Sequence, residues 1–443
     1  MLNVNERIYG LSLIWSEAKY NFVYWNRLGA LDWDGEYRAA MERVSLPMDD
    51  LEYFLTLSRF ITLLNDGHTL VAFPDAMSDS FRALPVRMRL TGSEHVVINV
   101  AEGCPVPPFS RVTAINGTPI AEYMENTVFP HCWHAKASSA CAALYQFAYL
   151  SGNSDKNAYA FIPVLEKGDV RLATTSGEFT LSKVERMQKW RLPECLVPSE
   201  KLRDIYTSDS LTVRAAEDDI AVITLPSFMD NSMPTAFYAL LPRLASMRAF
   251  IIDVRGCPGG NSSNADAVAQ AFISGQFANE RVRHRVHIGA YKAWGWRADF
   301  SRFDMSDPWQ KKVRDVCLGD LFEDETTAAR FPECPLTLDQ PVIALEDAAT
   351  ASSAENLLVD LDNIGRVTIM GEQSYGSTGN PLIMSLPGGG RAGICTRACL
   401  YPDGREFINT GVKPHVPAAP SPTDLAAGRD FVLDQAFAYL RNN

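Results

Sequence analysis

Apolar residues in the first part of the chain recur at the spacing of an α-helix. Trp15, Ala18, Phe22 and Trp25 follow one another at intervals of three or four, and residues 51–64 repeat the same period. The second of these stretches runs into a polar turn at 65–69 and then a short apolar run at 70–73. The pattern predicts an N-terminal helical region over residues 1–78 that ends in a turn and a strand.

Shorter, strand-like apolar runs replace this pattern in the next part of the chain. They occupy residues 86–90, 95–100 and 110–120, and Asn116-Gly117 inside the last of them is a tight-turn signal. A helical insert is predicted around residues 134–151. Residues 79–205 are therefore expected to form a smaller β-rich module.

Strands and helices alternate over residues 206–443. Apolar strands are predicted at 220–225, 249–254, 341–345 and 366–370, with helical patterns between them and a closing helix at 425–440. Strands that are separated by helices favour a largely parallel sheet. The predicted class is α/β, with this region as its core.

Charge and composition exclude several classes of partner. The 41 Lys and Arg residues are set among 53 acidic residues, giving a formal net charge of -12, and they form no basic cluster that would bind nucleic acid. No apolar run approaches the roughly 18 residues that a membrane-spanning helix needs, and the first residues do not resemble a secretory signal. The nine cysteines, an odd number at irregular spacing, favour reduced thiols. A cytoplasmic protein is expected.

The most informative segment is residues 350–355, Thr-Ala-Ser-Ser-Ala-Glu, between a predicted strand and a predicted helix. A serine at this junction exposes its hydroxyl at a helix N-terminus, where unpaired N–H groups favour developing negative charge. Ser352 is therefore a candidate nucleophile. The alternative is a helix cap, with Ser352 and Glu355 forming an S-x-x-E capping box.

A second candidate element, residues 253–260, follows the strand at 249–254. Its glycines, Gly259 and Gly260, allow backbone N–H groups to approach a ligand closely, as an oxyanion hole requires. The alternative is a βα turn without a ligand. The spacing and lysine of a phosphate-binding loop are absent.

Four ordered motifs, within roughly residues 206–420, resemble the C-terminal processing (tail-specific) serine peptidase family. They are D-x-R-x-x-x-G-G at 253–260, T-A-S-x-A-E at 350–355, G-E-x-x-x-G at 371–376 and D-G…G-V-x-P at 403–414. Residues 114–120 resemble a segment of that family's PDZ-like module. The resemblance implies a ClpP/crotonase-like α/β core, Ser352 as nucleophile, and an oxyanion hole formed by Gly259, Gly260 and the N–H of Ser353.

The expected general base differs from that of the bacterial processing branch of the family, in which a lysine is the general base. Its place is taken here by Ser377, and no lysine is nearby. The D-G-H-T element at 66–69 is similar to the tricorn-like branch, which implies His68 as base; the alternative is a turn histidine. Histidine can take and return a proton near neutrality.

The third catalytic residue is less constrained by sequence. Tricorn-like enzymes use a late glutamate, which corresponds to Glu406. Asp66 is too close to His68 in sequence to reach the imidazole easily, although an N-terminal turn could permit it. The serine that precedes the histidine in tricorn is Gly67 here, so that relay is not expected.

The resulting prediction is a serine peptidase that acts on peptide or protein substrates through an acyl-enzyme, without a metal or cofactor. One alternative is a degenerate protein of the same fold that binds peptides or hydrophobic ligands. Another is a hydrolase of small esters. Because many relatives assemble, a homo-oligomer is left open.

Overall fold

The computed structural model describes residues 1–91, 93–132, 158–185, 196–325 and 328–442. Three helices open the chain: α1 (Val4–Asn21), α2 (Trp33–Ser45) and α3 (Asp50–Thr62). The side chains of Asn3, Asp32 and Asp49 cap their first turns, so each helix begins where a polar residue can accept its unpaired N–H groups. The predicted N-terminal helices are confirmed.

Short strands and helical turns follow. β2 (Val86–Thr91) pairs with β3 (Glu94–Val100), while β4 (Val112–Ile115), β5 (Thr118–Pro119), β6 (Val170–Thr174) and β7 (Gly177–Leu181) form a second antiparallel sheet. Asn116 and Gly117 both have positive φ, as the predicted tight turn requires. The remaining elements here are α4 (Asp75–Ser80), α5 (Ile120–Tyr123), η2 (Met124–Val128), η3 (Phe129–His131), η4 (Ala158–Phe161) and α7 (Ile162–Leu165). The helical insert predicted around 134–151 lies outside the described residues.

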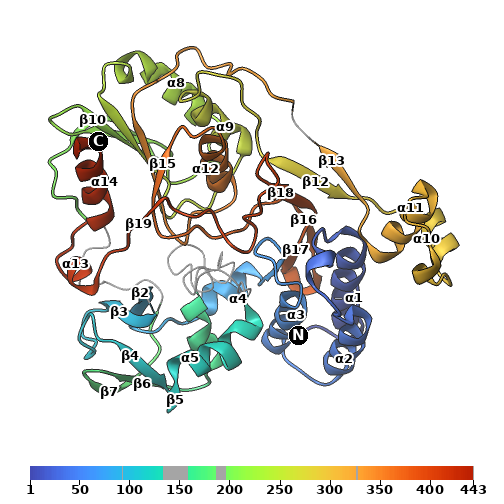
Figure 1. The fold of residues 1–443 in the computed structure, drawn as a ribbon. Coiled ribbons are helices and arrows are strands. Elements are labelled where there is room, and N and C mark those ends of the chain that lie inside the picture. The colour runs from blue at the N-terminus through green and yellow to red at the C-terminus, as the bar shows by residue number, and fades with distance from the viewer. Residues whose placement is uncertain (92, 133–157, 186–195, 326–327, 443) are drawn as a thin grey trace.

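A seven-stranded sheet forms the centre of the molecule (Figure 1). Its order is β19 (Val416–Pro417), β15 (Thr368–Gly371), β14 (Val342–Glu346), β11 (Ala249–Asp253), β10 (Ile220–Thr224), β9 (Thr212–Ala215) and β8 (Arg203–Thr207). The strands from β19 to β10 are parallel, and β9 and β8 are antiparallel. The predicted α/β class with a largely parallel core is confirmed.

Helices cover both faces of this sheet. α8 (Met233–Leu244), α9 (Ser262–Gln270) and α12 (Ser353–Asn363) lie on one face, and α14 (Phe431–Asn442) packs on the other against Ile251, Ile343 and Leu345. Every residue of β11 and β14 is buried, which is why these two strands are almost continuously apolar in the sequence.

The closing helix predicted at 425–440 is two helices instead of one. α13 (Pro422–Ala426) ends before Gly428, whose φ of 66° reverses the chain, and α14 begins at Phe431. A glycine with positive φ just after a helix is a common helix stop.

A small sheet joins the two ends of the chain. β1 (Leu70–Ala72) pairs antiparallel with β17 (Arg391–Cys395), which pairs with β16 (Pro381–Ser385); η6 (Pro387–Gly389) lies in the turn between β16 and β17. This pairing draws the 65–69 turn from the N-terminal region towards the central sheet.

The remaining described elements include a three-stranded sheet and two helices that project from it. β12 (Arg281–Arg285) lies between β13 (Phe322–Glu325) and β18 (Arg397–Leu400), and α10 (Gly289–Gly295) and α11 (Pro308–Leu318) project from them (Figure 1). The short helices η1 (Trp25–Arg27) and η5 (Phe300–Arg302) complete the described elements. No helix among the described residues is long and apolar enough to cross a membrane. The seven cysteines in the described ranges are free thiols, as predicted.

The packing of α14 predicts a large effect of truncating Phe437, which is 1% exposed between this helix and the sheet. Phe437→Ala is expected to lower the free energy of unfolding by about 3–5 kcal/mol, because it removes buried ring contacts and leaves a cavity. Chemical denaturation measures this change. Gln435→Ala, at an exposed position of the same helix, is the control, and equal effects in both variants would contradict the assigned packing.

Candidate active site

The carboxyl ends of the parallel strands carry the candidate site. Adjacent strands β11 and β14 lead into the loops 254–260 and 347–352, and β15 leads into 372–377. Loops that leave the same edge of a parallel sheet lie side by side, and this edge is where ligands usually bind in α/β folds. The predicted nucleophile and oxyanion elements are thereby brought together.

Ser352 stands immediately before α12 in an unusual backbone conformation. Its φ of 55° and ψ of -124° lie outside the regions that non-glycine residues ordinarily occupy. Such a conformation costs roughly 1–3 kcal/mol and persists only where the surroundings impose it. Ser352 is partly exposed, whereas its neighbours Ala351 and Ser353 are buried. The fold therefore presents this serine alone to solvent.

Hydrogen bonds hold the loop of Ser352 against the glycine loop. The N–H of Ala351 donates to the carbonyl of Cys257 at 3.0 Å, and the Ser353 hydroxyl donates to the carbonyl of Gly260 at 2.8 Å. Thr350 Oγ1 donates to the carbonyl of Val254 at 2.9 Å. The two loops form one rigid unit.

Gly259 has to be a glycine in this arrangement. Its φ is 90°, and a Cβ there would lie 2.6 Å from Cβ of Ser352 and 2.7 Å from the backbone nitrogen of Ser353. The backbone N–H groups of Gly259, Gly260 and Ser353 have no hydrogen-bond partner among the described residues. Unpaired N–H groups beside a serine are what an oxyanion hole requires.

Glu355, for which the sequence suggested only a capping role, joins several segments of the candidate site. Its fully buried carboxylate accepts hydrogen bonds from the N–H groups of Gly376 at 2.7 Å, Ser377 at 3.0 Å and Ser352 at 3.3 Å, and from the Ser374 hydroxyl at 2.5 Å. Burial raises its pKa to about 7, although these donors oppose the shift. The glutamate half of the proposed capping box is present, and it also fastens the 374–377 segment to the nucleophile.

His68 reaches the site from the turn before β1. Its backbone N–H donates to Asp66 Oδ2 at 3.0 Å, and Thr69 Oγ1 donates to the same oxygen at 2.7 Å. Asp66 therefore shapes the turn that carries His68. Burial raises the pKa of Asp66 to about 6 and lowers the pKa of His68 to about 4.

Ser377 links His68 to Ser352. Its hydroxyl lies 2.5 Å from Nδ1 of His68, and its backbone carbonyl accepts the N–H of Ser352 at 2.9 Å. Ser377 occupies the place of the lysine in the bacterial processing branch, so the departure seen in the sequence could have pointed to it.

Glu406, the predicted third catalytic residue, lies in a largely exposed position. Its side chain is 63% exposed and pairs with Arg27 at 3.4 Å. Its assignment as the third catalytic residue stays a prediction.

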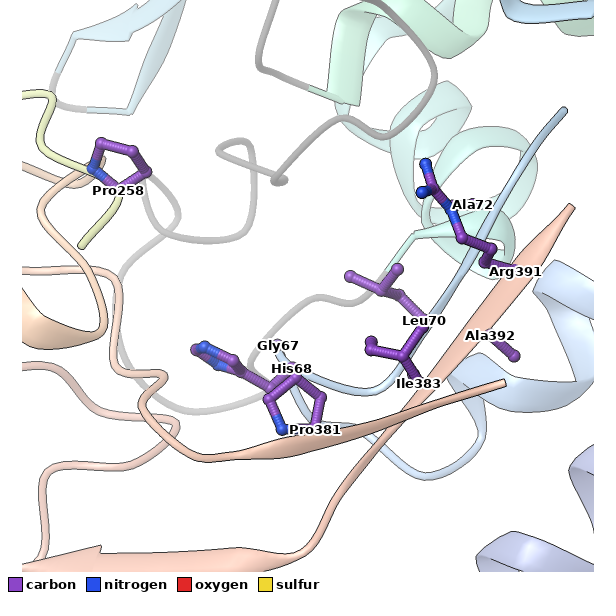
Figure 2. Close-up of a pocket in the computed structure, with 10 residues that line it drawn as sticks. Gly67, His68, Leu70, Ala72, Pro258, Pro381, Ile383, Arg391 and Ala392 are labelled. Atoms are coloured by element: carbon purple, nitrogen blue, oxygen red, sulfur yellow. The ribbon is translucent and has the colours of Figure 1, made fainter. Parts of the chain in front are cut away.

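An apolar cavity of about 270 Å³ opens beside His68. Figure 2 shows Leu70 and Ile383 on its floor, Pro258 of the glycine loop across from His68, and Arg391 towards the other end. Arg391 is half-exposed and lies 3.8 Å from Asp75. Within the described ranges, no group of three or more His, Cys, Asp or Glu side chains could hold a metal ion.

Comparisons with known proteins identify the family of the central part of the chain. Residues 219–418 match the family described as Peptidase family S41. The chain carries a peptidase family S41 domain. A carboxy-terminal-processing protease of Bartonella bacilliformis is 23% identical over 241 residues, which are 53% of this chain and 46% of that protein. The match thus spans about half the length of the curated relative.

Solved structures share the fold of this chain. Mature CPAF has a TM-score of 0.67 at 13% identity, covering 99% of this chain and 98% of that one. Mature CPAF complexed with lactacystin has a TM-score of 0.66 at 13% identity, with 99% of each chain covered. These similarities extend over nearly the whole chain and support the fold.

The buried surroundings of His68 predict an unusually acidic titration. Burial penalises the charged imidazolium, so the ring should gain its proton only as the pH falls to about 4, well below the ordinary value of about 6.5. NMR of a protein with isotope-labelled histidine measures the midpoint, with His68→Gln identifying the signal.

The same shift makes stability depend on pH. The imidazole of His68 has a pKa near 6.5 in the unfolded chain and about 4 in the folded chain. The contribution of neutral His68 to stability is therefore fully present above pH 6.5 and is lost as the pH falls through about 4. A midpoint for His68 at or above 6.5 would contradict the buried environment described.

Proposed function

We propose that this S41 chain is a serine peptidase that cleaves peptide bonds through an acyl-enzyme. The observation that carries the proposal is the position of Ser352. It stands partly exposed in a strained conformation at the start of α12, beside three backbone N–H groups that have no partner within the described ranges, and is joined to His68 through Ser377. A helix cap alone requires neither the strain nor the adjoining N–H groups.

The chemistry follows from these positions. His68 takes the proton of the Ser352 hydroxyl as its oxygen attacks the carbonyl carbon of the scissile bond. The N–H groups of Gly259 or Gly260 and of Ser353 stabilise the oxyanion. The C–N bond then breaks, and His68 gives its proton to the leaving amine. Water, deprotonated by His68, hydrolyses the acyl ester and restores Ser352.

The use of histidine in place of lysine is proposed as the tricorn-like feature of this chain. The pKa of His68, lowered to about 4 by burial, keeps the imidazole neutral and able to accept a proton over the whole physiological range.

The apolar cavity is proposed to hold a substrate side chain. It adjoins His68 and Pro258, and Pro258 directly precedes Gly259, so a peptide whose carbonyl lies in the oxyanion hole has a neighbouring side chain within reach of the cavity. Leu70, Ile383 and Ala392 favour an apolar side chain, while Arg391 favours an acidic group at the far end. Peptide or protein substrates are therefore expected to be apolar next to the cleaved bond.

Labelling with a fluorophosphonate probe tests the activated serine. The wild-type protein should gain one adduct by intact mass, whereas Ser352→Ala and His68→Ala should gain none, because the first lacks the nucleophile and the second its base. Ser176→Ala is the control, since its hydroxyl pairs with Ser110 in a remote turn. An unlabelled but folded wild-type protein would favour a degenerate binding protein.

A substitution in the glycine loop tests the oxyanion hole. Gly259→Ala should lower kcat by at least about 100-fold, because its methyl group would collide with Ser352 and displace the N–H groups. Gly256→Ala is the matched control: it also has positive φ, but its Cβ would meet nothing within 4 Å. Similar losses in the two variants would indicate general backbone strain instead of a specific oxyanion site.

A charge in the apolar cavity tests substrate selection. Ile383→Asp should lower kcat/KM for peptides with a large apolar residue by about 10-fold or more, because it places a carboxylate against that side chain. Peptide-library cleavage measures this change. Leu382→Asp is the control, since Leu382 is also exposed but is not among the cavity-lining residues. Equal effects would show that the cavity does not select the substrate.

A further inference from the structure

Ser377 contacts both members of the proposed nucleophile–base pair. Its hydroxyl lies 2.5 Å from Nδ1 of His68, and its carbonyl accepts the N–H of Ser352. We propose that Ser377 is the positioning residue for His68, accepting a hydrogen bond from Nδ1–H and so holding the tautomer whose Nε2 carries no proton. This inference rests on the proposed function and identifies the group that orients its base.

The direction of this hydrogen bond matters for the reaction. A neutral imidazole has one nitrogen that donates and one that accepts. If Nδ1–H donates to Ser377, Nε2 is left to take the proton of Ser352. If the Ser377 hydroxyl donated to Nδ1 instead, Nε2 would carry the proton and could not act as a base. Orientation of the catalytic tautomer is the role that a buried acid plays in a serine protease triad.

The position of Ser377 is fixed by groups on three segments. Its N–H and that of Gly376 donate to Glu355, and the carbonyl of Gly376 accepts the N–H of Asn409 at 2.6 Å. Ser377 is fully buried. A hydroxyl held in this way loses little further freedom when it bonds to the imidazole, so it can orient the ring as a charged group would.

Gly67 provides the space for this serine. A Cβ on residue 67 would lie 2.7 Å from both Cβ and Oγ of Ser377, and 2.8 Å from Cε1 of Tyr375. A side chain at position 67 and the serine at 377 therefore exclude each other. In the sequence, Gly67 indicated only that the relay serine of tricorn is missing. In the structure, the absence of a side chain at this position leaves room for the Ser377 hydroxyl.

The two carboxylates considered from sequence are placed differently. Asp66 accepts hydrogen bonds from the backbone N–H of His68 and from the Thr69 hydroxyl. Glu406 is largely exposed and pairs with Arg27. Nδ1 of His68, by contrast, lies within hydrogen-bond distance of the Ser377 hydroxyl. Ser377 is therefore the better placed of the three to orient the base.

The test compares full-length Ser377→Ala, Glu406→Gln and Thr378→Val with the wild-type protein. Thr378 is the matched control, because it is the next buried residue and its hydroxyl lies 3.3 Å from Asn356 Oδ1. The rate of inactivation by a fluorophosphonate probe is measured over a range of probe concentrations. This separates the maximal rate of reaction from the binding of the probe.

Ser377→Ala should slow the maximal inactivation rate by up to about 100-fold, the scale expected for a misoriented catalytic group. Its probe-binding constant should stay within about twofold of the wild-type value. Thr378→Val should keep the wild-type rate within about twofold, and Glu406→Gln should be slowed less than Ser377→Ala. A fully reactive Ser377→Ala protein, or a Glu406→Gln protein slowed as strongly as expected for Ser377→Ala, would overturn the proposal.

Nitrogen-15 NMR of labelled histidine provides a readout that does not depend on activity. The wild-type His68 should show a protonated, hydrogen-bonded Nδ1 and an unprotonated Nε2, and Ser377→Ala should lose that preference. A protonated Nε2 in the wild-type protein would refute the assigned direction. If the wild-type protein were not labelled by the probe at all, the peptidase proposal would fail, and the tautomer seen by NMR would still decide the role of Ser377.

Discussion

The buried carboxylate of Glu355 is the interaction on which the site depends. It lies in the first turn of α12 and gathers N–H groups from both ends of the site, from Ser352 on one side and from Gly376 and Ser377 on the other. Ser374, which also donates to Glu355, accepts the N–H of Val412 and so ties the late loop to the same point. A carboxylate removed from water is costly unless such donors surround it. The segments around Glu355 are consequently constrained to one arrangement.

This constraint holds the proposed nucleophile and the distant proposed base in one arrangement. The strained backbone of Ser352 is held by the bonds of Ala351 and Ser353 to the glycine loop and by its own N–H to Ser377. The same Ser377 presents its hydroxyl to His68. The energy stored in the backbone is offset by a dense set of hydrogen bonds that only the folded chain can form.

The central sheet supplies the rigid base for these loops. β11 and β14 are buried on both faces, and Arg255 locks the loop after β11 to the C-terminal part of the chain by pairing with Asp253 and Asp430 at 2.7–2.9 Å. The neighbouring acids raise the pKa of Arg255, although burial opposes them. The D-x-R part of the motif therefore has a structural role, whereas Gly259 lies against Ser352.

The sequence alone determined the α/β class, the central strands and the segments that hold Ser352 and the paired glycines. These features are encoded locally, because apolar periodicity fixes each element and glycines mark the close approaches. The family resemblance then suggested His68. Sequence did not determine what lies next to the imidazole. His68 reaches the site through the pairing of β1 with β17, and the group beside it is Ser377, more than 300 residues away along the chain. Nor did it reveal that α13 and α14 are separate, or that Glu406 pairs with Arg27. Contacts of this kind depend on how distant loops pack against one another, and only the tertiary structure decides them.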